Sequence, residues 1–211
     1  KNKAGSEKVN LQGLVIGDGW VNPYYHYLSY PDYAFGLGLI DKVTRDELTK
    51  VVEKNKAKLL AGELVDDVFG VLPTIRMIAG NRAVKVDTDD IRRYVTYDIS
   101  GAPDTPLELP AVAQYLNWNP ANDTLGWKEA YLRSVKEAVH AKENPDDWTF
   151  CNSSVVASLQ PIINAPTYKL LPDLLKAMPI LFYSGQYDMV VNHIGTQMMI
   201  DAIDWPGKEG Y

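Results

Sequence analysis

The strongest chemical signal in the sequence is an apolar run that leads into an aspartate. Residues 179–183 have the length and composition of a buried strand, Ser184-Gly185 is a turn signal, and Asp188 follows just beyond it. A carboxylate in such a loop can hold a catalytic histidine in the correct tautomer and stabilise the imidazolium that forms. Turns also favour aspartate for conformational reasons, so a plain turn or capping role stays open at this point.

A second turn, Gly17-Asp-Gly19, follows a strand-like run at residues 11–16 and invites comparison with a dinucleotide-binding loop. Asn22 stands where the third glycine of such a loop belongs. Pro23 and a cluster of tyrosines follow where a helix start should receive the pyrophosphate. The neighbouring residues therefore argue against a nucleotide site, and we expect no cofactor.

The acidic stretch Asp87-Thr-Asp89-Asp90 resembles the opening of a calcium-binding loop. Arg92 occupies the position that needs glycine, and Asp98 the position that needs a bidentate glutamate. A solvated acidic turn is therefore the expectation. The three histidines share no ligand spacing with one another or with the single cysteine, so we expect no metal site: His26, His140, His193 and Cys151.

The composition is that of an ordinary globular protein, with 46% hydrophobic and 23% charged residues among 211. The net charge of -6 argues against a nucleic-acid surface. No apolar run approaches the roughly 20 residues of a membrane span. Two N-x-Ser/Thr sequons, at Asn122 and Asn152, weakly favour the secretory pathway.

The apolar spacing along the chain predicts short strands separated by a long helical region. Pro23 and Pro31 are expected to break up any long helix between residues 20 and 33. Thr44 begins a capping sequence, so a helix is expected to start there. The other expected elements are strands at 11–16 and 179–183, helices at 44–59, 65–79, 131–141, 170–178 and 196–203, and an irregular stretch at 86–110.

This order predicts an α/β fold with a mixed, mostly parallel sheet and an inserted, mainly helical cap of about 100 residues. We expect core segments at residues 1–23 and 126–211 and the cap at residues 24–125. The cap begins just after a strand, and the C-terminal ends of strands are where open α/β sheets place their ligands.

Several segments, in the same order along the chain, resemble the serine carboxypeptidase family, which includes carboxypeptidase Y, cathepsin A and the vitellogenic-like carboxypeptidases. The vitellogenic-like members look most similar, through residues 16–19, 185–188 and 204–207. The resemblance implies an α/β-hydrolase core. The matching segments are residues 9–23, 35–41, 135–141, Trp148, Cys151-Asn152, 179–188, Asn192 and Asp204-Trp205.

The resemblance implies that Asp188 is the acid of a Ser-Asp-His triad. It also implies that five residues line the pocket for the penultimate substrate residue. Their large aromatic and aliphatic side chains predict an apolar preference, although each of them could equally serve packing alone. These substrate-binding candidates are Trp20, Tyr27, Tyr30, Val190 and Val191.

The sequence departs from the family by what it lacks. It contains neither Gly-x-Ser-x-Gly nor the family's Gly-Gly-Pro-Gly-Cys turn. In the family the serine precedes this region and the histidine follows it. We therefore expect an internal piece of a longer protein, inactive by itself. The resemblance further implies a disulfide from Cys151 to a cysteine upstream of residue 1.

The whole protein is expected to release C-terminal amino acids from peptides, in the secretory pathway, as a secreted or lysosomal/vacuolar enzyme. Its expected partners are peptide substrates and the remaining segments of the same protein, with no nucleic acid or membrane, and the resemblance is compatible with a homodimer. Two alternatives stay open: an acyltransferase or hydroxynitrile lyase on the same scaffold, and a non-catalytic binding or chaperone-like relative.

Overall fold

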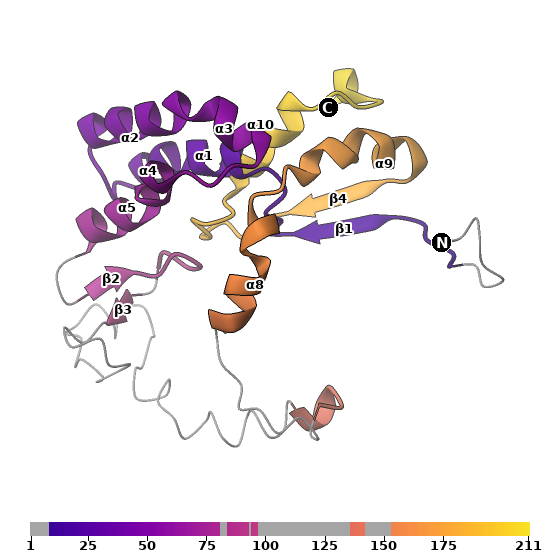
Figure 1. Cartoon of the computed structure of the whole chain (residues 1–211), viewed down its shortest axis with the longest axis horizontal. Coiled ribbons are helices and arrows are strands. Elements are labelled where there is room, and N and C mark those ends of the chain that lie inside the picture. Colours follow the sequence, from indigo (N-terminus) through magenta and orange to yellow (C-terminus); the bar gives the residue numbers. More distant parts are fainter. Residues whose placement is uncertain (1–8, 81–83, 93, 97–135, 142–152) are drawn as a thin grey trace.

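The computed structural model describes residues 9–80, 84–92, 94–96, 136–141 and 153–211 (Figure 1). A small parallel sheet lies beside a layer of helices that is formed by the first half of the chain. The elements, in chain order, are β1 (Leu14–Gly17), α1 (Pro23–Gly36), α2 (Lys42–Lys54), α3 (Lys56–Ala61), α4 (Asp66–Phe69), α5 (Val71–Ala79), β2 (Val84–Val86), β3 (Tyr94–Thr96), α8 (Ser153–Ile163), η1 (Thr167–Leu170), α9 (Leu171–Ala177), β4 (Ile180–Tyr183), α10 (His193–Ala202) and η2 (Lys208–Gly210).

Strands β1 and β4 pair in parallel, although they come from opposite ends of the chain. Leu14 lies opposite Ile180, and Gly17 lies opposite Tyr183. Both predicted strands are thereby confirmed. Because the two strands run in the same direction, their C-terminal ends meet at one edge of the sheet, and the Gly-Asp-Gly turn and the Asp188 loop both begin there.

One face of this strand pair is packed and the other is open among the described residues. The packed face carries Ile16, Ile180 and Phe182 against side chains of α9 and α10, and half-buried residues alternate with exposed ones along both strands. On the open face Val15 is 63% and Leu181 59% exposed. Parallel sheets are normally covered on both faces, so this face is expected to receive further parts of the protein.

Helix α1 runs through both prolines, so the expected break at residues 20–33 was wrong. Pro23 occupies the first turn, where its missing N–H would have had no helical partner. Pro31 lies inside the helix, where proline ordinarily costs about 3 kcal/mol. Burial of a face of tyrosines, including Tyr24 and Tyr30, offsets that cost, and such tertiary packing is not visible in local propensity.

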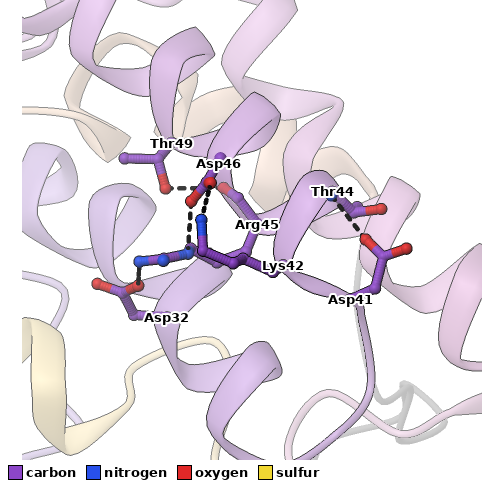
Figure 2. A network of polar contacts seen from close by, with 7 residues as sticks. All are labelled: Asp32, Asp41, Lys42, Thr44, Arg45, Asp46 and Thr49. Atoms are coloured by element: carbon purple, nitrogen blue, oxygen red, sulfur yellow. Dashed lines mark hydrogen bonds and ion pairs between the residues drawn. The ribbon is translucent and has the colours of Figure 1, made fainter.

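Helix α2 begins one turn earlier than its expected capping sequence. Its N-cap is Asp41, whose Oδ1 accepts a hydrogen bond from the Thr44 backbone N–H at 2.7 Å, rather than Thr44 itself (Figure 2). From the first turns of α2, Arg45 reaches across to α1 and pairs with Asp32 at 3.0 Å. This pair ties the two helices together beside their apolar contact.

Strand β3 and the last residue of β2 lie in the stretch expected to be irregular, residues 86–110, of which residues 93 and 97–110 are outside the described part of the chain. Strands β2 and β3 pair antiparallel, with Val84 opposite Thr96 and Val86 opposite Tyr94. Each strand has only three residues, which is too short for an alternating apolar pattern to be recognised in the sequence. The residues of the connection, 87–92, are called the hairpin segment below.

Some expectations fall outside the described residues. Most of the predicted helix at 131–141, Cys151 and both sequon asparagines, Asn122 and Asn152, are among them. The division into core segments and a cap at residues 23/24 and 125/126 stays a prediction. Within the part of the chain that is described, no helix is long and apolar enough to cross a membrane.

Candidate active site around Asp188

Asp188 lies in the loop of residues 184–192 that joins β4 to α10, called the acid loop below. Its first part is a turn in which the Asp188 N–H donates to the Gly185 carbonyl at 3.2 Å. Its last residue, Asn192, is the N-cap of α10 and accepts from the Gly195 N–H at 3.0 Å. The Asn192 amide also donates to the Met189 carbonyl at 3.0 Å. The loop is therefore anchored to the helix that follows it.

The two carboxylate oxygens of Asp188 have different surroundings. Oδ1 accepts hydrogen bonds from the backbone N–H groups of Val190 at 2.8 Å and Val191 at 3.0 Å. No group among the described residues donates to Oδ2, which leaves it able to receive an imidazole N–H. Burial raises the pKa of Asp188, the two backbone N–H groups oppose that rise, and the charges of Asp18 and Asp89 add to it.

The turn after β1 supports the start of the acid loop. Asp18 accepts a hydrogen bond from the Gly185 N–H at 2.8 Å, and its own N–H donates to the Tyr183 carbonyl at 2.9 Å. Asp18 has a φ of 45°, a left-handed conformation that aspartate tolerates better than most residues. Sequence reasoning identified this turn but assigned no role to Asp18. The Gly-Asp-Gly pattern was the available signal, and its partner lies 167 residues away.

Four of the five predicted substrate-binding residues form a continuous series of contacts from Trp20 to Val190 of the acid loop, and the fifth, Val191, follows in the same loop. Trp20 meets Tyr27 edge to face at 5.2 Å between ring centroids, and Tyr27 meets Tyr30 at 5.7 Å. The Tyr30 hydroxyl donates to the Val190 carbonyl at 2.9 Å. Val191 is the residue whose N–H binds Asp188. Tyr30 is only 1% exposed, and its hydrogen bond fixes the acid loop to α1. Trp20 is partly exposed to solvent.

His26 packs against Trp20 and the turn that precedes it. Its ring stacks on Trp20 at 5.1 Å, and its Nε2 lies 3.1 Å from the Gly19 carbonyl oxygen. A carbonyl can only accept, so Nε2 carries the proton of a neutral ring. Burial lowers the pKa of His26 to about 4. The fully buried ring thus stays neutral in mildly acidic surroundings and fixes the turn rather than taking part in proton transfer.

Comparisons with known proteins identify the family of the chain. The family model described as serine carboxypeptidase matches residues 1–211. The chain is 31% identical to the pheromone-processing carboxypeptidase KEX1 of Tuber melanosporum and 35% identical to that of Pyricularia oryzae. Each alignment covers 100% of this chain and 33% of the relative. The chain therefore spans about a third of the length of these relatives.

The crystal structure of the prohormone-processing carboxypeptidase Kex1Δp of Saccharomyces cerevisiae superposes with a TM-score of 0.65 at 21% sequence identity. That match covers 98% of this chain and 44% of the yeast one. It confirms the expected α/β-hydrolase fold. Together with the family match over the whole length of the chain, it leads to one conclusion. The chain belongs to the serine carboxypeptidase family.

Proposed function

We propose that the protein containing this chain is a serine-type carboxypeptidase that releases C-terminal amino acids from peptides. The observation that carries the proposal is the state of the Asp188 carboxylate. One oxygen is held by two backbone N–H groups, and the other is open at the C-terminal edge of the sheet. This is the arrangement that the acid of a Ser-Asp-His triad requires, within a chain of the matching family.

In the proposed mechanism, Asp188 accepts the N–H of a histidine ring and keeps its other nitrogen free to act as a base. That base takes the proton of a serine hydroxyl as the oxygen attacks the carbonyl of the last peptide bond. The proton then passes to the leaving amine, and water resolves the acyl-enzyme by the same route. The serine and the histidine would come from parts of the protein outside this chain.

The aromatic and aliphatic residues beside the acid loop would receive the side chain of the penultimate substrate residue. Trp20 and Val190 are partly exposed and would offer apolar surface to it, while Tyr27, Tyr30 and Val191 are buried and would fix the position of that surface. Burial of an apolar substrate side chain against such surface is favourable by about 25 cal/mol per Å². The proposed specificity is therefore for apolar residues in this position.

The similarity to pheromone- and prohormone-processing enzymes supports a secretory route, because peptides of these kinds are processed on their way out of the cell. A secreted or lysosomal/vacuolar destination, peptide substrates and association with the remaining segments of the same protein are parts of the proposal. A homodimer stays compatible with it.

The proposed disulfide of Cys151 can be tested directly. A lone cysteine in a chain with secretory features is expected to have a partner elsewhere in the protein. Peptide mapping of the full-length protein without reduction should yield Cys151 joined to a peptide from upstream of residue 1. A Cys151 thiol that alkylates freely in the native, unreduced protein would contradict this pairing.

The activity itself is tested on the full-length protein with N-blocked dipeptides. The blocked Phe-Leu peptide should release leucine, and the same peptide with a C-terminal amide should react far more slowly. Replacing the penultimate Phe by Asp should lower kcat/KM. Each tenfold loss corresponds to about 1.4 kcal/mol of lost transition-state binding. Stoichiometric labelling by a fluorophosphonate should abolish release.

Three other outcomes would replace the proposal. Transfer of acyl groups to alcohols without peptide hydrolysis would indicate an acyltransferase, and release of cyanide from hydroxynitriles would indicate a lyase. Absence of both labelling and turnover in a folded protein would indicate a non-catalytic relative.

A further inference from the structure

The hairpin segment, residues 87–92, contacts the acid loop on both sides of Asp188. The Met189 N–H donates to the Thr88 carbonyl at 2.9 Å. The Ile91 N–H donates to the Tyr187 carbonyl at 3.1 Å. These two hydrogen bonds involve the residues immediately before and after Asp188. The backbone that carries the carboxylate is thus fixed from outside the core segment to which it belongs.

The hairpin segment has internal contacts that fix its own shape. The Asp87 carboxylate accepts from the Asp89 N–H at 2.9 Å, and Asp90 accepts from the Arg92 N–H at 3.1 Å. The Arg92 guanidinium also binds Asp90 through two nitrogens, at 2.9 and 2.8 Å. Two aspartate turns and an ion pair therefore hold the segment in the conformation that presents its carbonyl and N–H groups to the acid loop.

A side-chain contact adds to the backbone contacts. The Arg92 guanidinium lies over the Tyr187 ring, 4.1 Å from its centroid. The Tyr33 hydroxyl of α1 donates to the Gln186 carbonyl of the same loop at 2.8 Å. The acidic stretch that looked like a solvated turn in the sequence is thus packed against the candidate catalytic loop, with only its outer side chains in solvent.

We infer that the hairpin segment is a positioning element for the triad acid, acting through the hydrogen bonds at Thr88 and Ile91 and the contact of Arg92 with Tyr187. The inference rests on the proposed function, in which Asp188 orients the histidine. The segment lies within residues 24–125, the range predicted to form the cap. The part of the protein expected to cover the substrate would therefore also fix the acid, and loss of its contacts would let the carboxylate move away from the histidine.

The test uses the full-length protein and two substitutions at one position. Ile91→Pro removes the N–H that donates to Tyr187, and Asp90 already forms a turn of the kind that accepts proline at its second position. Ile91→Ala keeps the N–H and removes the side chain, so it is the matched control. We expect kcat of the proline variant to lie about 10- to 100-fold below that of the alanine variant, at equal KM.

Equal kcat values for the two folded variants would overturn the inference. If the proline variant does not fold, Arg92→Gln replaces it, because Arg92 is exposed and its removal leaves the core intact. Loss of its contact with Tyr187 should lower kcat about two- to fivefold without changing KM. An unchanged kcat in that variant would likewise overturn the inference.

A double-mutant cycle separates this inference from the proposed function. If the hairpin segment acts through Asp188, adding Ile91→Pro to Asp188→Asn should cause no further loss of kcat. A further loss equal to that in the wild-type background would show that the segment acts independently of Asp188, and would overturn the inference alone. A wild-type kcat for Asp188→Asn would instead overturn the proposed function.

Discussion

Replacing Asp188 by Asn in the full-length protein is expected to lower kcat by about 10³–10⁴-fold. The asparagine oxygen can still accept from the N–H groups of Val190 and Val191, so the acid loop keeps its shape. Its amide NH₂ then takes the place of Oδ2 and can only donate. A histidine facing a donor adopts the wrong tautomer and can no longer take the serine proton. The loss is measured as initial rates on a blocked dipeptide.

The thermal stability of the Asp188→Asn variant should change little. Because the folded-state pKa of Asp188 is raised above its ordinary value, the charged form that prevails at neutral pH is disfavoured by folding. A neutral asparagine avoids that cost but loses the hydrogen bond from the proposed histidine, so the melting temperature at pH 7 should stay close to that of the wild type. Asp173→Asn, at an exposed site on α9 where the carboxylate pairs with Lys176, is the matched control and should leave kcat unchanged.

A folded Asp188→Asn variant that keeps more than about a tenth of wild-type kcat would contradict the assignment of Asp188. Loss of the acid that fixes the histidine tautomer is expected to lower kcat far more than tenfold. A variant that loses both activity and its melting transition would instead identify Asp188 as a structural residue.

The second large effect is expected at Gly195, where α10 crosses α1. A Cβ on this residue would lie 2.7 Å from His26 Nδ1, 2.8 Å from Ser29 Oγ and 3.0 Å from the His26 Cα. These atoms cannot easily retreat, because His26 is held by Gly19 and Trp20 and the Ser29 hydroxyl donates to the His26 carbonyl. Gly195→Ala should therefore force the helices apart and lower the free energy of unfolding by about 1–3 kcal/mol.

Gly36→Ala provides the control for this substitution. Gly36 also lies in a helix, but a Cβ there would meet nothing within 4 Å. Alanine should therefore be neutral or stabilising by up to about 1 kcal/mol, through its higher helix propensity. Both variants are compared by thermal denaturation of the full-length protein. A Gly195→Ala variant as stable as Gly36→Ala would show that α1 and α10 do not pack as closely as described.

The parts of the fold that were predicted are those whose cause is local. The strands at 179–183 and 11–16 are apolar runs followed by turn residues, and such runs form buried strands wherever the sheet lies. The error at α1 has a tertiary cause. Pro31 is a true helix-breaking signal, and it was overridden by the burial of tyrosines against side chains of α2 to α5 and against Met189.

The candidate site follows the same division. Asp188 and the five substrate-binding candidates could be proposed because strand ends and the family resemblance can be recognised in the sequence alone. The role of Asp18 could not, because its partner Gly185 is joined to it only by the pairing of β1 with β4. The hairpin segment was missed for the same reason. Its own residues indicate a turn, and nothing in them identifies the loop against which that turn packs.

The long separation between paired elements also constrains the order of events while the chain is being made. Helix α1 buries His26 and Ser29 against Gly195 of α10, and the turn at Asp18 closes on Gly185, 167 residues later. At translation rates of about 5–20 residues per second, the first half leaves the ribosome on the order of ten seconds before its partners exist. During that interval the side of α1 that packs on α10 and the edge of β1 that pairs with β4 are uncovered. The nascent chain is therefore exposed to association at this stage for longer than a fold of local contacts would be.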